Sequence, residues 1–324
     1  MDSTTSPTNK EITMEIPDFF RLYNDGTIER LQNSPIVPPM LDDPAADGVS
    51  SKDVVISHDP SISARLYLPK IDHDHHNNNK LLPILVYFHG GGFYFESAFN
   101  QIYHTYFNLF VSKVHVLVVS VEYRLAPETP VPAAYDDCWE ALKWVATNTD
   151  PWLINHGDFN RVFIGGDSAG GNIVHHIAMR AGAEALPGDV KVFGAILSHP
   201  FFLSSKPIGS EPVEGYEHTM PFATWDLVCP SAPGGYDNPM INPLANGVSG
   251  LATLGCSKIL VCVAQKDSLR DRGVWYYDAV KKSGWQGELQ LFEVEDEDHV
   301  FYAVNPESEN AMKMHQRFAD FLLQ

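Results

Sequence analysis

A serine between glycines is the residue of this chain whose surroundings most directly suggest chemistry. The segment from Gly166 to Gly170 is Gly-Asp-Ser-Ala-Gly, which matches the G-x-S-x-G pattern of a nucleophile elbow. The glycines permit the tight strand-to-helix turn that leaves the serine hydroxyl exposed. Because a buried strand is predicted before the motif and a helix after it, the pattern favours Ser168 as a nucleophile over an ordinary Gly/Ser turn.

A glycine-rich loop is the predicted source of hydrogen bonds for the oxyanion that forms when a serine attacks an ester. His89-Gly90-Gly91-Gly92 directly follows another predicted strand, and glycines there let backbone N–H groups face a substrate oxygen. We expect donors at Gly91 and Gly92 and a third at Ala169, with His89 and Gly90 completing the loop. A phosphate-binding loop is disfavoured, because the Lys-Ser/Thr ending and the G-x-G-x-x-G spacing are both absent.

The acid that orients the catalytic base is expected at the carboxyl end of a later strand. Asp267 lies there, just after the apolar run Ile259 to Val263. Asp271 is the competitor, and we expect it to pair locally with Arg270, Arg272 or solvent instead.

The base is expected last, because nucleophile, acid and histidine follow one another in this order in enzymes with such an elbow. His299 follows the predicted strand Glu288 to Val294 and is the last histidine but one. His315 lies beyond it, in the closing amphipathic helix, and is predicted to be a surface residue. His199 and His218 are interpreted as packed or surface histidines and are left out of the site.

The elements that must position these residues alternate between strand and helix. Short, nearly continuous apolar runs are typical of strands buried on both faces, and alternation with helices predicts an α/β fold with a mostly parallel central sheet. Predicted strands are Asp53 to Ser57, Ile62 to Leu68, Leu82 to Phe88, Val114 to Val121, Arg161 to Gly165, Val192 to Ser198, Ile259 to Val263 and Glu288 to Val294. Predicted helices are Ala134 to Thr147, Gly170 to Ala183, Arg272 to Ser283 and Glu307 to Leu323.

Two segments do not fit this alternation and are predicted to contribute a lid. One is residues 1–45, with an amphipathic piece around Phe19 to Leu31, and the other is the Pro/Gly-rich stretch of roughly residues 201–250. Irregular stretches of this length in a compact enzyme are often functional loops. We therefore expect one catalytic domain over residues 1–324. Aromatic residues that could line its pocket are Phe93, Tyr94, Phe95, Phe201, Phe202, Tyr216, Phe222 and Trp225, about half of which we expect to be plain core.

Composition limits the partners that the protein can have. The chain has 324 residues and a formal net charge of -19, and it contains no run of Lys or Arg, so nucleic acid and anionic membranes are not expected partners. No motif implies a cofactor or a metal site, and the three histidines of Asp72 to Lys80, an exposed turn, are not expected to bind one. The four cysteines are predicted to be free thiols. A cytoplasmic protein, monomeric or weakly dimeric, with a small-molecule ester as its substrate is expected.

Five motifs together resemble the plant carboxylesterases of the hormone-sensitive-lipase group, which have the α/β-hydrolase fold. They are His89-Gly-Gly-Gly92, Tyr123-Arg-Leu-Ala-Pro-Glu128, Gly166-Asp-Ser-Ala-Gly170, Lys266-Asp-Ser-Leu-Arg-Asp-Arg-Gly273 and His299-Val-Phe301. The resemblance covers about Phe19 to Leu323. It implies the same nucleophile, acid, base and oxyanion donors, a lid made partly from the N-terminal segment, and esters of plant specialised metabolites as substrates.

The same plant group contains members that are not esterases. Gibberellin receptors have lost the catalytic histidine, so the presence of His299 disfavours a pure receptor. Other members, such as 2-hydroxyisoflavanone dehydratases, catalyse eliminations, and related plant proteins catalyse cyclisations of alkaloid intermediates. The sequence therefore predicts a serine carboxylesterase that forms an acyl-enzyme on Ser168, with elimination or cyclisation on an isoflavonoid or alkaloid intermediate as the alternative.

Overall fold

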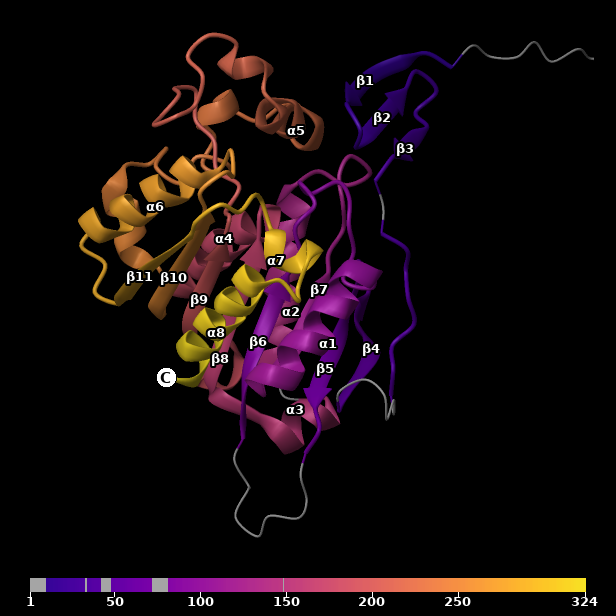
Figure 1. Ribbon diagram of the computed structural model, residues 1–324, viewed down its shortest axis with the longest axis vertical. Helices are drawn as coiled ribbons and strands as arrows, with labels where there is room; N and C mark the ends of the chain where they lie inside the picture. Colours follow the sequence, from indigo (N-terminus) through magenta and orange to yellow (C-terminus); the bar gives the residue numbers. More distant parts are fainter. Residues whose placement is uncertain (1–9, 33, 42–47, 72–80, 148) are drawn as a thin grey trace, which may run out of the picture.

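A twisted eight-stranded sheet forms the centre of the protein (Figure 1). The computed structural model describes residues 10–32, 34–41, 48–71, 81–147 and 149–324. The strand order is β11-β10-β9-β8-β6-β7-β5-β4. Strands from β6 onward pair in parallel, whereas β5 pairs antiparallel with both β4 and β7. The predicted α/β class with a mostly parallel sheet is confirmed.

The elements have the following bounds. The strands of the large sheet are β4 (Val49–His58), β5 (Ser61–Pro69), β6 (Leu82–Phe88), β7 (Leu117–Glu122), β8 (Gly157–Asp167), β9 (Val192–Ser198), β10 (Cys256–Ala264) and β11 (Glu288–Val294). The helices are α1 (Gln101–Val114), α2 (Pro132–Thr147), α3 (Pro151–His156), α4 (Ala169–Ala183), α5 (Met220–Val228), α6 (Arg270–Lys282), α7 (Phe301–Val304) and α8 (Glu309–Leu323).

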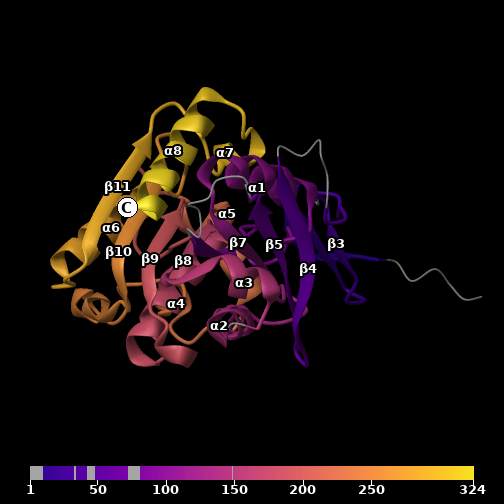
Figure 2. The same ribbon diagram turned by 90° about the horizontal axis from the view of Figure 1, so that it is seen from below.

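Helices cover both faces of the sheet, as the view from below shows (Figure 2). Buried residues of α2, α4 and α6 form one hydrophobic cluster with the sheet, and those of α1, α7 and α8 form a second on the other face. The central strands are buried on both faces, with Val86 and Phe88 of β6 and Ile164 of β8 fully buried. This double burial explains why their sequences are continuous apolar runs.

Most predicted elements are found within a few residues of their expected bounds, but the two longer helices α1 and α5 and the short helices α3 and α7 were missed. The run predicted as a strand from Val114 begins with the end of α1, a helix rich in buried aromatic residues such as Tyr106 and Phe110. Gln101, Thr105, Asn108 and Ser112 form a polar stripe at helical spacing, exposed or half-exposed in the structure, and this stripe is the signal that would have predicted the helix. The other longer helix that was missed is α5, which lies inside the segment predicted to be irregular.

The N-terminal segment forms a small antiparallel sheet instead of a helix or loop. Its strands are β1 (Ile12–Ile16), β2 (Phe20–Tyr23) and β3 (Ile28–Arg30). It packs on the residues after the glycine loop, where Phe19 lies 5.5 Å from Phe95 between ring centroids and Phe20 lies 5.5 Å from Tyr94. In Figure 1 it projects above the sheet opposite α5.

Residues 201–250 form the second projection, which contains α5 and short 3-10 turns. A buried guanidinium connects this segment to α6: Arg272 donates to both carboxylate oxygens of Glu211 at 2.7 and 2.6 Å and to Oγ of Ser204 at 2.7 Å. Tyr216 also accepts a hydrogen bond from Arg272. A buried charge is stabilised only when it is paired in this way, so Arg272 fixes the base of the projection.

Candidate active site

Ser168 lies in the tight turn between β8 and α4. Its backbone φ is 53°, in the left-handed region, and its N–H donates to the carbonyl of Ser198 at 2.9 Å. The carbonyl of Ser168 accepts the N–H of Phe201 at 2.9 Å. Left-handed backbone is unfavourable for a residue with a Cβ and persists only where the surroundings fix it. Hydrogen bonds to the end of the neighbouring strand β9 supply this constraint.

The two glycines of the motif are required by close backbone contacts. A Cβ on Gly170 would lie 1.9 Å from the carbonyl oxygen of Phe88, and one on Gly166 would lie 2.5 Å from the backbone of Gly170. Real atoms do not approach so closely, so any larger residue would push α4 away from β6. The glycines therefore allow the helix to begin directly against the sheet, with Ser168 at its N-terminus.

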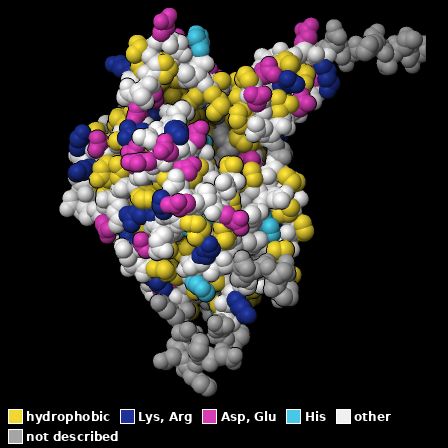
Figure 3. All heavy atoms as spheres, viewed as in Figure 1, with side chains coloured by type: hydrophobic (Ala, Val, Ile, Leu, Met, Phe, Trp, Pro, Cys, Tyr) yellow, Lys and Arg dark blue, Asp and Glu magenta, His cyan; other side chains and the backbone are white. Residues whose placement is uncertain are grey.

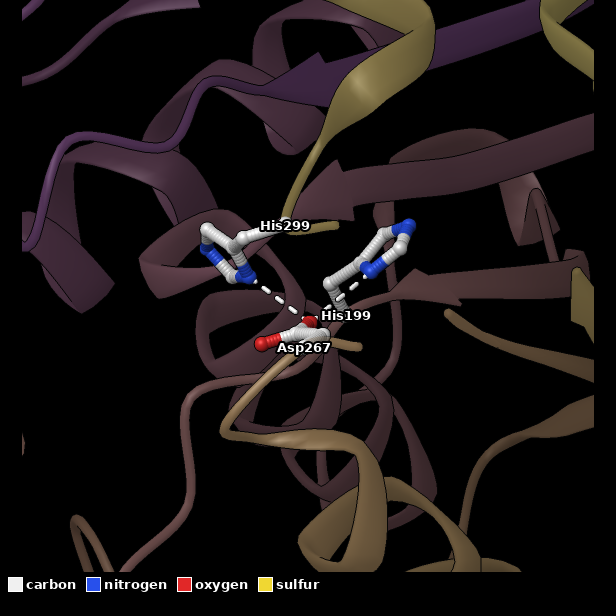
Figure 4. Close-up of side chains that lie close together, drawn as sticks. All are labelled: His199, Asp267 and His299. Carbon is white, nitrogen blue, oxygen red and sulfur yellow. Dashed lines mark hydrogen bonds and ion pairs between the residues drawn. The ribbon is translucent and has the colours of Figure 1, made fainter. Parts of the chain in front are cut away.

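Asp267 and His299 lie together, as predicted, at the carboxyl ends of β10 and β11. Nδ1 of His299 lies 2.8 Å from Oδ2 of Asp267 (Figure 4). The other carboxylate oxygen of Asp267 accepts the N–H of Leu269 at 2.8 Å. The Asp267 side chain is 1% exposed, whereas that of His299 is 34% exposed. The carboxylate is thus fixed inside the protein, and the imidazole connects it to the open side.

The electrostatics of this pair favour opposite charges. Burial alone would raise the pKa of Asp267, but the charge of His299 and hydrogen bonds from His199 and His299 lower it below its usual range. Burial alone would lower the pKa of His299, but Asp267, together with Asp167 and Asp298, raises it above its usual value. An ionised acid next to a histidine is the arrangement that stabilises an imidazolium.

The glycine loop contains two amides that are candidate oxyanion donors. Gly91 and Gly92 have φ values of 94° and 57°, and the carbonyl of Gly91 accepts the N–H groups of Tyr94 and Phe95, both at 3.0 Å. Within the described part of the chain, neither glycine amide donates a hydrogen bond to a protein acceptor. Ala169 is the first residue of α4, where backbone N–H groups lack partners within the helix.

The remaining loop residues have structural roles. The N–H of Gly90 donates to the hydroxyl of Tyr103 at 2.7 Å, so it is not available to an oxyanion. Tyr103 in turn donates to the buried carboxylate of Asp167 at 2.9 Å. His89 is fully buried, stacks on Tyr123 at 4.2 Å between ring centroids and has its pKa lowered to about 4 by burial. These contacts hold the loop against the sheet.

A cavity of about 590 Å³ is lined by four of the candidate residues, whereas Asp267 and Ala169 lie outside its lining. Ser168, His299, Gly91 and Gly92 all contribute to its wall. Hydrophobic side chains gather where the two projections face each other above the sheet (Figure 3). The remaining lining residues, many of them apolar, are Phe19, Gln32, Tyr94, Phe95, Glu96, Ile102, Tyr103, Asp167, Phe201, Met220, Pro221, Thr224, Ser268, Leu269, Asp298, Val300, Ala303 and Val304. Both segments predicted to cover the site therefore contribute to the cavity wall.

One further titratable group lies in this wall. Glu96 follows the glycine loop with a left-handed φ of 66°, and its carboxylate accepts a hydrogen bond from Asn100. Burial, together with the nearby charge of Asp167, raises the pKa of Glu96 to about 7. No Lys or Arg lies among the described residues that line the cavity. Glu96 can therefore exist in either protonation state near neutral pH.

Three predictions about other residues have clear outcomes. Asp271 pairs with Arg270 at 2.6 Å, which confirms the predicted local pairing, and it also accepts hydrogen bonds from Ser210. The prediction that His315 is a surface residue is wrong, because its ring is buried between α8 and α1, against Tyr106 and Phe110. The four cysteines are free thiols, as predicted.

Of the aromatic candidates, three line the cavity and the others are buried elsewhere. Tyr94, Phe95 and Phe201 belong to the wall, whereas Phe93, Phe202, Tyr216, Phe222 and Trp225 are buried outside it. His218 is exposed. The histidine-containing segment Asp72 to Lys80, predicted to be an exposed turn, lies outside the described residues.

Sequence reasoning missed His199. This histidine follows β9 and is fully buried, and its Nδ1 lies 3.0 Å from Oδ2 of Asp267 (Figure 4). The available signal was topological: His199 follows a strand that pairs with β10, and the carboxyl ends of neighbouring parallel strands lie at the same edge of a sheet.

His199, Asp267 and His299 form a cluster whose possible metal-ligand atoms lie within 4.8 Å of one another. Both histidine Nδ1 atoms, however, already contact the same carboxylate oxygen at hydrogen-bond distance. This geometry is that of a histidine–aspartate hydrogen-bond network, so we assign no metal to it.

No helix in the described part of the chain combines the length and apolar character that crossing a membrane requires.

Comparison with known proteins defines the class of the molecule. A family model described as the alpha/beta hydrolase fold matches residues 85–303. The chain belongs to the α/β-hydrolase family, in the plant hormone-sensitive-lipase-like group that its motifs predicted.

Named relatives in this family have more than one activity. The chain is 55% identical over 330 residues to a 2-hydroxyisoflavanone dehydratase of Glycyrrhiza echinata, with 99% of each chain covered. It is 42% identical over 321 residues to a probable carboxylesterase of Arabidopsis thaliana, with 97% of this chain and 98% of the relative covered. A hyperthermophilic esterase from the archaeon Pyrobaculum calidifontis matches with a TM-score of 0.68 and 28% identity, with 84% of each chain covered.

Proposed function

We propose that the protein is a serine carboxylesterase that hydrolyses small, largely apolar carboxylic esters through an acyl-enzyme on Ser168. The observation that carries this proposal is the shared cavity, which Ser168, His299, Gly91 and Gly92 all line. An esterase needs a nucleophile, a base and oxyanion donors around one substrate position. The α/β-hydrolase family and its esterase members support the same reaction class.

The mechanism follows from the positions of these groups. His299 removes the proton from Ser168 as its oxygen attacks the ester carbonyl, and ionised Asp267 stabilises the resulting imidazolium. The amides of Gly91, Gly92 and Ala169 stabilise the tetrahedral oxyanion. The alcohol leaves with the proton from His299, and water then repeats the two steps and releases the acid.

The two projections act as a lid over this site within one catalytic domain. Phe19 and Gln32 of the N-terminal segment and Met220, Pro221 and Thr224 of α5 support this role, because they line the cavity above the serine. Covering an active site excludes water and orients the substrate. The four free thiols support a cytoplasmic location, because the cytosol keeps thiols reduced.

Covalent labelling combined with turnover tests the proposal. Purified protein is incubated with short-chain p-nitrophenyl esters, with and without a fluorophosphonate, and the adduct is located by peptide mass spectrometry. We expect turnover, its loss on labelling, and the label on Ser168. Ser168→Ala should lose turnover by a factor on the order of a million and take no label. Ser283→Ala, on the far end of α6, is the matched control and should behave as the wild type.

Labelling at another residue would overturn the assignment of the nucleophile, and Ser168→Ala with near-normal turnover would overturn the mechanism. Labelling at Ser168 without turnover of any ester would leave the elbow intact but contradict the esterase function. That last outcome would favour the second candidate reaction.

Elimination of water from a hydroxylated plant metabolite is the second candidate, and Glu96 is the observation that favours it. In such a reaction a base takes a proton from carbon, and an acid protonates the departing hydroxyl, which leaves as water. His299 can act as the base, and Glu96, whose pKa is raised to about 7, can act as the acid in the same cavity. The dehydratase name of the Glycyrrhiza echinata relative supports testing this reaction.

The two functions are distinguished by one substitution. With 2-hydroxyisoflavanone as the probe, loss of one water is followed by mass spectrometry. If elimination is the native reaction, Glu96→Gln should slow it by about a hundredfold or more and leave hydrolysis of p-nitrophenyl acetate within a few-fold of wild type. No dehydration by the wild type, or equal dehydration by Glu96→Gln, would contradict this assignment.

A further inference from the structure

His199 contacts the same carboxylate oxygen as the candidate base. Its Nδ1 lies 3.0 Å from Oδ2 of Asp267, and Nδ1 of His299 lies 2.8 Å from that oxygen. Figure 4 shows the two rings on either side of the carboxylate, each turned toward it through Nδ1. With the N–H of Leu269 on the other oxygen, Asp267 accepts three hydrogen bonds. Its orientation therefore depends on all three donors.

The surroundings of His199 fix its protonation state. An ionised carboxylate can only accept hydrogen bonds, so Nδ1 of His199 must carry a proton. Its Nε2 is buried and has no hydrogen-bond partner within the described residues. Protonation of Nε2 would bury both an unpaired N–H and a positive charge. Burial accordingly lowers the pKa of His199 in spite of the opposing effect of Asp267, and the ring is neutral.

The position of His199 is also rigid. Its φ is 47°, its N–H donates to the carbonyl of Cys262 at 2.8 Å, and its side chain is 0% exposed. The ring packs against Tyr302 and Phe301 at centroid distances of 5.9 and 6.0 Å. His299, in contrast, is open to the cavity. Of the two histidines on this carboxylate, only His299 can reach a substrate.

We propose that His199 is a positioning residue: its neutral ring donates Nδ1–H to Oδ2 of Asp267 and so holds the carboxylate in the orientation in which it accepts Nδ1–H of His299. The proposal rests on the function proposed above for Ser168, Asp267 and His299. It adds a fourth side chain, which does not touch the substrate. His199 also takes up part of the hydrogen-bonding capacity of Asp267, and this weakens the pull of that carboxylate on the proton of His299.

A pair of substitutions tests the role of the donor. His199→Asn keeps an N–H donor close to the position of Nδ1, whereas His199→Phe keeps a ring of similar size and removes the donor. We expect His199→Phe to lower kcat for p-nitrophenyl acetate by about tenfold to a hundredfold with little change in KM, and His199→Asn to recover most of this loss. His315→Phe is the matched control, because His315 is also a buried histidine, its two ring nitrogens have no hydrogen-bond partner among the residues that the structure describes, and it lies outside the site.

The pH profile separates this role from simple packing. His299 faces Asp267, Asp167 and Asp298 as well as the neutral His199 ring. Its neutral form is the base, so kcat/KM falls as the pH drops through its pKa. Without the His199 donor, Asp267 attracts the His299 proton more strongly, and the acidic limb should move upward by about half a pH unit or more. His315→Phe should leave the limb unchanged. A limb that does not move in His199→Phe, or that moves downward, would overturn the proposal.

A spectroscopic measurement keeps the proposal testable if no ester is turned over. Hydrogen bonds from imidazole N–H to a carboxylate give proton resonances far downfield, and we expect two such signals in the ¹⁵N-histidine-labelled wild type. His199→Phe should lose one and His299→Phe the other. A single signal in the wild type, assigned to His299, would exclude the His199 hydrogen bond whatever the reaction is. Two signals without ester turnover would instead place the failure in the proposed function.

Discussion

The carboxyl edge of the central sheet is built differently from its cover. The cover consists of the two projections, the small sheet β1–β3 and residues 201–250. At the edge, backbone hydrogen bonds between strand ends fix the reactive residues, as the N–H of Ser168 on the carbonyl of Ser198 illustrates. The cover is held against the rest of the protein by side-chain contacts, such as those of Phe20 with Tyr94 and of Glu211 with Arg272, and some apolar side chains remain exposed, including Met220 at 52%. In the function proposed above, the edge supplies the reacting groups, whereas the cover selects the substrates that reach them.

After loss of Ser168, replacement of the acid at the edge should have the largest effect. Asp267→Asn keeps the shape but removes the negative charge that stabilises the imidazolium of His299, so we expect kcat to fall by about ten-thousandfold with p-nitrophenyl acetate. Asp271→Asn is the control, because Asp271 pairs with Arg270 and Ser210 outside the cavity. Steady-state kinetics of the two variants check the prediction. A comparable loss in Asp271→Asn would transfer the role of the acid to that residue.

The same difference explains what the sequence could predict. Strands β6 and β9 have the predicted bounds, since a buried parallel strand must be an apolar run and its end must be a loop. The candidate residues Ser168, Asp267 and His299 follow such ends, so local patterns sufficed to locate them. The small sheet β1–β3 and helix α5 were not predicted, because their structure depends on contacts with distant residues: Phe20 of β2 packs against Tyr94, and Val228 of α5 accepts the N–H of Val131.

Two histidines show the limits of residue-by-residue reasoning. His315 belongs to an apolar stripe with Ala311, Met314 and Phe318 at helical spacing, all of them buried. Attention to that stripe would have predicted its burial. His199 could have been placed only by combining the strand order with the positions of strand ends, because nothing in its local sequence separates a network histidine from an ordinary packed one.

Loosening the N-terminal cover should have an intermediate effect. Arg30 donates to the carbonyls of Tyr94 and Ala126 and pairs with Glu128 at 2.7 Å, and so ties β3 to the loop beside the cavity. Arg30→Met keeps an apolar stem of similar length but removes these bonds. We expect KM for p-nitrophenyl esters to rise about threefold to tenfold, with kcat changed by less than twofold.

Glu128→Gln provides the matched control for Arg30→Met, because it removes only the ion pair. The Glu128 side chain is 52% exposed, and exposed pairs contribute little, so KM should stay close to the wild-type value. Kinetics on the acetate and on longer esters check both variants. A fall in kcat equal to the rise in KM would mean that the N-terminal segment holds the catalytic residues themselves. That result would contradict the assignment of the chemistry to the edge alone.

The smallest effect is expected from Met220, at the rim of the cavity on α5. Its half-exposed side chain lines the wall, so Met220→Ser should weaken binding of long acyl chains without altering the chemistry. Partial burial of one or two methylene groups against this residue corresponds to about a twofold to fourfold change in kcat/KM. We therefore expect the ratio of kcat/KM for p-nitrophenyl hexanoate to that for the acetate to fall by this factor, while the acetate rate stays constant. A fall in the acetate rate alone would show that α5 contacts the reacting end of the substrate, and the cover would then share in the chemistry that this comparison assigns to the edge.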